Sequence, residues 1–392
     1  MTLRRKLALI AALYFVEGFP MGVYRDVWQA LYFTEAGFSK TAVGVASGFG
    51  LAWSLKVLWS PLVDRFGDWR HWIAGALTAM AAVLALVPGL GSGEALWFAV
   101  AVFCLASATQ DIALDAYSVP LTERGEEGPL NAARTSAYRI GRLALGAGLP
   151  LLATAAGWAS AHRVAAVFAA VAALLVLFAP RPALVPKLRR DWRGMLRSWA
   201  RPGLAHALGF LVLHRLGDFA LAPMVGPFWI ERGFTRAEFA SLSTFAGVWA
   251  GISGAVFAAW FVARATLERA LAIGLALAVA SNLAYAGAAL SGSPAAVVAA
   301  GVCESLCSGA AGVAFMALLV RACERSHAAV QYAALTAFYP LSGSLVGMLS
   351  GATVERIGFA GYFALTASFA LPSLLLIPMA VRWADAGSPA RS

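Results

Sequence analysis

Two carboxylates four residues apart stand inside an otherwise apolar segment of the chain. Asp111 and Asp115 belong to a predicted helix over residues 95–118. Because four residues make just over one helical turn, the two side chains share one face of that helix. An ionisable group within an apolar span costs free energy and usually marks a pathway, a proton relay or an ion pair. The spacing therefore predicts that these carboxylates carry a proton or hold a basic partner.

Acids and bases are equally numerous inside the predicted apolar helices, which favours mutual pairing. Arg139 and Arg142 share a face of the next helix, and together with Arg134 they could meet the two carboxylates. The alternatives are proton coupling or gating and a set of fixed ion pairs that only orient helices. The acids are Glu17, Asp26, Asp111, Asp115, Asp218 and Glu304, and the bases are Arg25, Lys56, Arg134, Arg139, Arg142 and Arg215. The coupling or gating candidates are Glu17, Asp111, Asp115, Arg139, Arg142, Asp218 and Glu304.

Arginines beside a cavity would suit an anionic ligand, because a guanidinium makes bidentate contacts with carboxylate or phosphate. Arg25 could instead reach the membrane interface by snorkelling. Neutral polar side chains in membrane helices often only hold helices together, so each is an open candidate. The expected substrate-binding residues are Arg25, Gln29, Tyr138, Arg215, Asn282, Tyr332 and Tyr339.

The composition indicates a polytopic α-helical membrane protein. Of 392 residues, 60% are hydrophobic and 13% are charged, against about 25% charged in soluble domains. The net charge of +10 does not indicate nucleic-acid binding, since the basic residues lie in short loops between apolar runs. No phosphate-binding glycine loop and no set of metal ligands is recognisable. We expect no cofactor, no metal and no enzymatic activity.

Twelve segments are apolar and long enough to form membrane helices. A basic linker at 180–203 separates an N-terminal six-helix half at 1–179 from a C-terminal half at 204–392. Lys and Arg concentrate on the side of both termini, which predicts that the termini are cytoplasmic. The predicted helices are 7–32, 41–61, 72–88, 95–118, 130–157, 162–179, 204–230, 236–261, 267–288, 294–320, 328–352 and 358–381.

The two halves repeat at an offset of 196 residues. Residues 33–40 align with residues 229–236, and both stretches hold Glu, Gly, Phe, a hydroxyl residue and a base in matching places. Parallel six-helix halves of this kind are the architecture of major-facilitator transporters. The match lies in a predicted outer loop, where apolar composition alone does not explain it.

The inner loop between the second and third predicted helices carries Asp64, Arg65 and Gly67. It resembles the loop that major-facilitator proteins have in that place, which implies a role in holding the inner face closed. The alternative is a helix stop, with Pro61 and Gly67 as the residues that break the helix.

Motifs in both halves resemble the AmpG-type muropeptide permeases. They are Gln110-Asp111-Ile112 with Asp115-Ala116, Glu123-Arg124-Gly125, Tyr138-Arg139-Ile140-Gly141, the 56–65 region, Leu216-Gly217-Asp218, Ser281-Asn282 and the 304–319 region. The resemblance implies a proton-driven importer with the major-facilitator fold. Some of these permeases carry further C-terminal helices, whereas this sequence ends soon after its last predicted helix.

Together these features predict a proton-coupled secondary active importer that works by alternating access. The expected substrate is an anhydro-muropeptide, with a siderophore as the alternative for the same fold. A non-transporting membrane sensor or partner protein is the alternative of a different class. We expect a monomer in a bacterial-type inner membrane, whose partners are a small-molecule substrate, protons and the lipid bilayer, without nucleic acid.

Overall fold

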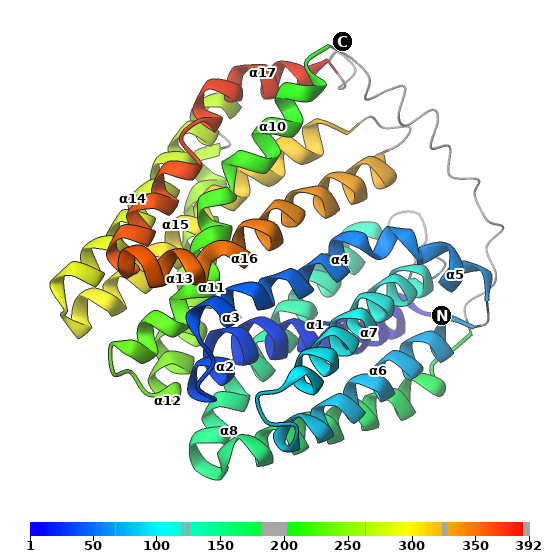
Figure 1. The fold of residues 1–392 in the computed structure, drawn as a ribbon. Coiled ribbons are helices and arrows are strands. Elements are labelled where there is room, and N and C mark those ends of the chain that lie inside the picture. Colours follow the sequence, from blue (N-terminus) through cyan, green and yellow to red (C-terminus); the bar gives the residue numbers. More distant parts are fainter. Residues whose placement is uncertain are drawn as a thin grey trace. The chain divides into compact units, whose positions relative to one another are not determined.

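The computed structural model describes residues 1–66, 68–118, 121, 126–181, 202–262, 264–323 and 328–386 (Figure 1). Within these ranges every regular element is a helix. Ten helical stretches are long and apolar enough to cross a membrane. The predicted all-α polytopic class is therefore confirmed.

The chain forms two compact units. Unit 1 comprises Met1–Phe38, Phe49–Lys187 and Thr235–Thr244. Unit 2 comprises Ser39–Gly48, Leu188–Phe234 and Phe245–Ser392. These units follow the predicted halves except for two short segments, 39–48 and 235–244, each of which belongs to the unit of the other half. The domain boundaries at 179 and 204 stay a prediction.

The elements of unit 1 are α1 (Leu3–Met21), the π-helix η1 (Gly22–Tyr32), α2 (Phe33–Glu35), α4 (Leu51–Leu55), the 3₁₀-helix η3 (Lys56–Leu58), α5 (Ser60–Arg65), α6 (Trp69–Leu86), η4 (Val87–Gly89), α7 (Glu94–Ser118), α8 (Glu127–Leu177) and α12 (Arg236–Glu238). Those of unit 2 are α3 (Lys40–Val45), α10 (Leu204–His214), α11 (Leu216–Glu231), α13 (Ala246–Val262), α14 (Leu267–Ser291), α15 (Pro294–Arg321), α16 (Ala328–Phe369) and α17 (Ser373–Asp385). Two more elements, η2 (Ala46–Gly50) and η6 (Phe239–Phe245), run across unit boundaries.

Helices α8 and α16 are each kinked at one glycine. Gly157 has φ +78° and Gly358 has φ +73°, a region that residues with a Cβ rarely adopt. The sequence predicts short loops at these places, and that detail is wrong, because a single glycine separates the helical legs. The stretch Pro129–Leu177 within α8 has 49 residues, and the stretch Pro340–Asp385, which runs from α16 through α17, has 46, about twice what one crossing needs. The count of twelve crossings, one for each leg, stays a prediction.

The predicted repeat is visible in the backbone of the two matching loops. Gly37 has φ +84° and Gly233 has φ +86°. In each loop the next amide donates to the carbonyl five residues before it, over 3.0 Å in the first copy and 3.2 Å in the second. Ser39 and Thr235 follow as N-caps of α3 and α12, and each accepts a bond from the amide three residues on. The same local sequence thus builds the same loop twice.

Glycines let helices within a unit approach one another closely. A Cβ at Gly141 of α8 would lie 2.0 Å from the carbonyl oxygen of Phe15 in α1. A Cβ at Gly18 of α1 would lie 2.1 Å from the carbonyl oxygen of Tyr138. Small residues at such contacts are how membrane helices gain packing energy without a hydrophobic effect between them.

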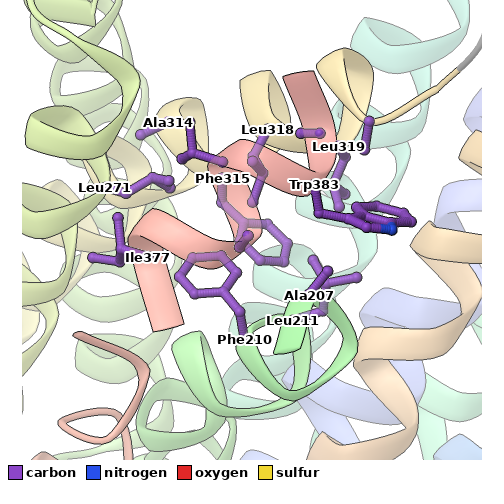
Figure 2. Close-up of a cluster of buried hydrophobic side chains, with 14 of the residues drawn as sticks. Ala207, Phe210, Leu211, Leu271, Ala314, Phe315, Leu318, Leu319, Ile377 and Trp383 are labelled. Atoms are coloured by element: carbon purple, nitrogen blue, oxygen red, sulfur yellow. The ribbon is translucent and has the colours of Figure 1, made fainter. Parts of the chain in front are cut away.

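A cluster of buried apolar side chains joins α10, α14, α15 and α17 in unit 2 (Figure 2). The rings of Phe210 and Phe315 lie near its centre, with centroids 6.4 Å apart. Leu271, Leu319 and Trp383 belong to the same cluster. Packing of this kind fixes the helices that carry the polar residues of unit 2.

The close approach of α1 and α8 gives a direct test of the packing. We expect Gly141→Ala to lower the free energy of unfolding by about 1–3 kcal/mol, because its methyl group would overlap backbone atoms. Denaturant unfolding in detergent micelles measures this change.

The matched control is Gly148→Ala on the same helix, where a Cβ would meet nothing within 4 Å. There the better helix propensity of alanine should leave the stability equal or higher. Equal effects of the two substitutions would contradict the packing described for α1 and α8.

Candidate functional site

A cluster of ionisable side chains lies in unit 1 where α1, η3 and α7 meet. Lys56 forms an ion pair and a hydrogen bond with Asp111. Glu17 interacts electrostatically with Asp111 and Asp115, and the Tyr14 hydroxyl donates to Asp115 over 2.8 Å. These five residues are called the Lys56 cluster below. The predicted common face of the two aspartates therefore meets Lys56, a base that the sequence did not pair with it.

Carboxyl groups outnumber bases in the Lys56 cluster. Lys56 interacts electrostatically with Glu17, Asp111 and Asp115. A second cation, Arg134, lies 5.6 Å from the centre of the Tyr14 ring and acts on Asp115, and it is counted with the Lys56 cluster from here on. Ionised carboxylates this close to one another repel, which favours a proton on one of them. One bound proton makes the group of three acids and two bases neutral.

Local backbone geometry brings Lys56 to Asp111. The predicted helix over 41–61 is not continuous, because two 3₁₀ segments interrupt it and Lys56 begins the second of them. The tighter winding of a 3₁₀ turn changes the direction of side chains relative to an α-helix. Close by, the Trp59 indole nitrogen donates to the Thr109 hydroxyl over 3.1 Å, which ties this segment to α7.

The expected pairing of Arg142 with the carboxylates of α7 is wrong. Its guanidinium instead donates two hydrogen bonds of 2.8 Å to the two oxygens of Asp26. Asp26 lies on the π-helix η1, which follows Pro20, and the packing of α1 on α8 brings it to Arg142. Arg139 is exposed, and among the described residues it makes no polar contact. Arg142–Asp26 is thus a balanced pair, unlike the Lys56 cluster.

Unit 2 holds a second group of charges, at the start of α11 and on α15. The Arg215 guanidinium lies 3.3 Å from the Asp218 carboxylate and donates to the Ser308 hydroxyl over 3.0 Å. Glu304 interacts electrostatically with both members of the pair and accepts a hydrogen bond of 3.3 Å from Ser305. We call Arg215, Asp218, Glu304 and Ser308 the Arg215 cluster. Its two carboxyl groups face one guanidinium, so here too the acids exceed the bases by one.

The predicted substrate-binding residues divide between the two units. Arg25 and Gln29 lie on η1, half-buried and buried, and Tyr138 is half-buried on α8. Asn282 is buried on α14, and its Oδ1 accepts no hydrogen bond from the residues that the structure describes. Arg215 is placed in the cluster above. The side chains of Tyr332 and Tyr339 lie outside the described part of the chain.

The predicted inner loop is described only in part. Gly67 and the side chain of Asp64 lie outside the described residues, and Arg65 lies 5.4 Å from the centre of the Phe66 ring. Their role in an inner gate stays a prediction.

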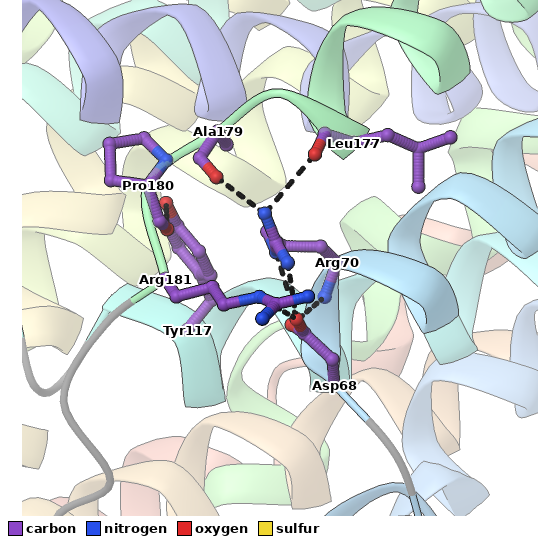
Figure 3. A network of polar contacts seen from close by, with 7 residues as sticks. All are labelled: Asp68, Arg70, Tyr117, Leu177, Ala179, Pro180 and Arg181. Atoms are coloured by element: carbon purple, nitrogen blue, oxygen red, sulfur yellow. Dashed lines mark hydrogen bonds and ion pairs between the residues drawn. The ribbon is translucent and has the colours of Figure 1, made fainter.

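A polar network follows directly after that loop (Figure 3). The Arg70 guanidinium donates to Asp68 over 2.6 Å and to the carbonyl oxygens of Leu177 and Ala179 over 3.1 and 2.8 Å. The Tyr117 hydroxyl donates to the carbonyl oxygen of Pro180 over 2.7 Å. These hydrogen bonds from Arg70 hold the pKa of Asp68 below its usual value. The network fastens the start of α6 to the ends of α7 and α8.

The sequence did not single out several residues of these clusters. Lys56 and Asp26 counted among the charges within helices, but no spacing rule connects either one to its partner. Tyr14 and Ser308 carried no signal, because hydroxyl groups are common in membrane helices. Only the packing of separate helices reveals these contacts.

The long apolar helices are those of a polytopic membrane protein, and solved structures identify the fold as that of major-facilitator transporters. A bacterial homologue of the human lysosomal transporter Spinster, solved in an inward-facing unoccupied conformation, matches with a TM-score of 0.77. The match has 14% identity and covers 100% of this chain and 98% of the other. The nucleoside transporter NupG matches with a TM-score of 0.72 and 14% identity over 97% and 99% of the two chains. At these identities the likeness concerns the fold alone.

The chain belongs to the anhydromuropeptide permease (AmpG) family. It is 31% identical to the anhydromuropeptide permease of Escherichia coli K12, over 94% of this chain and 78% of that protein. It is 26% identical to the putative transporter AmpG 4 of Rickettsia conorii, over 92% and 93% of the two chains. No protein-family model matches the sequence.

The ion pair in the Lys56 cluster predicts an energetic coupling between Lys56 and Asp111. We expect Lys56→Met to destabilise the protein, because it leaves the carboxyl groups without their closest base. Adding Asp111→Asn should recover part of that loss. The coupling free energy from the double-mutant cycle should be about 1–3 kcal/mol.

Unfolding of the single and double variants in detergent measures the cycle. A matched cycle on Lys56 and Glu94, an exposed residue at the other end of α7, should show no coupling. Additive effects of Lys56→Met and Asp111→Asn would contradict the pairing.

Proposed function

We propose that this transporter imports an anhydro-muropeptide together with protons. The observation that carries the proposal is the Lys56 cluster, in which carboxyl groups outnumber bases by one. Within low dielectric an unpaired charge is costly, so such a group favours binding one proton. A proton that is bound and released in step with the substrate is what coupling requires.

The substrate class is supported by the family and by the distribution of cations. The relative from Escherichia coli is named for anhydromuropeptide transport, and such compounds carry carboxylates on their peptide part. Arg139 lies exposed on α8 within an apolar span, and Arg25 lies half-buried on η1. A guanidinium in such a place suits a carboxylate ligand. The same reasoning applies to Arg215, if a ligand displaces its contact with Ser308.

The Arg215 cluster and Asn282 extend the proposal to unit 2. The buried amide oxygen of Asn282 could accept a hydrogen bond from a sugar hydroxyl or a peptide amide of the substrate. Glu304 and Asp218 share one guanidinium and form a second place for a proton. Transport then proceeds by alternating access in a monomer in a bacterial inner membrane, with both termini in the cytoplasm.

Uptake into proteoliposomes tests the coupling. With an inward proton gradient we expect the unmodified protein to accumulate labelled anhydro-muropeptide. Asp111→Asn and Asp115→Asn should remain folded but fall to the level of protein-free liposomes, because neither amide can exchange a proton.

Glu94→Gln is the matched control, since it removes a carboxylate from the exposed end of the same helix. Normal accumulation by both aspartate variants would contradict a coupling role for the Lys56 cluster. Uptake of a ferric siderophore in place of the muropeptide would leave the coupling proposal standing and show that the substrate is a siderophore.

A further inference from the structure

The two repeated loops carry ion pairs whose partners come from different halves of the sequence. In unit 2 the Lys40 ammonium lies 2.6 Å from the Glu231 carboxylate. The same ammonium lies 4.7 Å from the centre of the Phe359 ring. The next residue, Thr41, donates its amide and its hydroxyl to Glu355, over 3.0 and 2.6 Å. The beginning of α3 is therefore bound to α11 and α16 by polar contacts.

Unit 1 contains the reciprocal arrangement. The Arg236 guanidinium lies 3.0 Å from the Glu35 carboxylate and 5.3 Å from the centre of the Trp158 ring. It also donates to the carbonyl oxygen of Ala153 over 3.2 Å. The Trp158 indole donates to the same Glu35 carboxylate over 2.7 Å. One acid, one base and one aromatic ring thus form a compact group in each unit.

The two groups are equivalent under the repeat. An offset of 196 residues relates Glu35 to Glu231 and Lys40 to Arg236, and each acid pairs with the base of the other copy. The rings are equivalent as well, because Trp158 and Phe359 each directly follow the positive-φ glycine at which α8 or α16 is kinked. Two independent accidents would not reproduce the acid, the base and the ring in matching positions.

We propose that these two groups act as latches, that is, as contacts that are closed in this conformation and open together in one conformational change. Each holds the start of a half's second helix, and both must release when the transporter changes state, so the inference rests on the proposed alternating access. Their partial exposure suits this role. The side chains are 33% and 53% exposed in the Lys40–Glu231 pair and 29% and 18% in the Arg236–Glu35 pair. Pairs at such exposure stabilise weakly and can open reversibly.

Cysteine labelling tests the latches without any substrate. Val43 of α3 lies three residues after Lys40, Ala240 of η6 lies four residues after Arg236, and both are buried. Val43→Cys and Ala240→Cys are introduced separately into the full chain in liposomes, and a membrane-impermeant maleimide is applied. Mass spectrometry then reads alkylation at that residue alone. We expect Lys40→Gln to raise the labelling rate at both reporters about two- to fivefold, the change that loss of one weak ion pair allows.

Arg236→Gln should do the same at both reporters, because one movement releases both latches. Lys40→Arg and Arg236→Lys, which keep the charge, should restore protection. Arg356→Gln removes an exposed charge beside Glu355 and should change nothing.

Unchanged labelling in both neutral variants would overturn the inference, and so would labelling confined to the reporter of the broken group. If the protein shows this labelling pattern but no muropeptide uptake, the latch proposal stands and the proposed substrate is wrong.

Discussion

The cost of an unneutralised charge in an apolar environment is the constraint on which the rest of the structure depends. Arg142 and Asp26 satisfy it as a balanced pair with two hydrogen bonds, and such a pair has no need of a proton. The Lys56 cluster and the Arg215 cluster satisfy it differently, because in each the acids exceed the bases by one. Neutrality there depends on a bound proton, which connects the energetics of the fold to the chemistry of transport.

The repeat arranges strong and weak interactions in different places. Close glycine contacts, such as Gly141 against Phe15 and Gly254 against the carbonyl oxygen of Leu306, hold helices within a unit. The loops that repeat carry partly exposed ion pairs instead. A transporter needs helices that stay packed while other contacts open and close, and this division supplies both.

Much of the fold follows from the sequence alone. The length and continuous apolarity of a segment identify a membrane helix, and matching Glu, Gly and capping residues reveal the repeat. The common face of Asp111 and Asp115 was also predictable from spacing. Their partner was not. Lys56 reaches Asp111 because a 3₁₀ turn redirects it, and Arg142 turns to Asp26 because helices α1 and α8 pack at glycines. Contacts between helices far apart in the sequence depend on such packing, which no local pattern encodes.

The most direct measurement is infrared spectroscopy of the purified protein at neutral pH, read in the carboxyl stretching region. The excess of acids in the Lys56 cluster, where Glu17 interacts electrostatically with Asp111 and Asp115, predicts a protonated carboxyl band that disappears in Glu17→Gln. It should persist in Glu94→Gln, which alters an exposed carboxylate of α7. A spectrum without that band, or a band that Glu17→Gln leaves unchanged, would contradict a proton held in the Lys56 cluster.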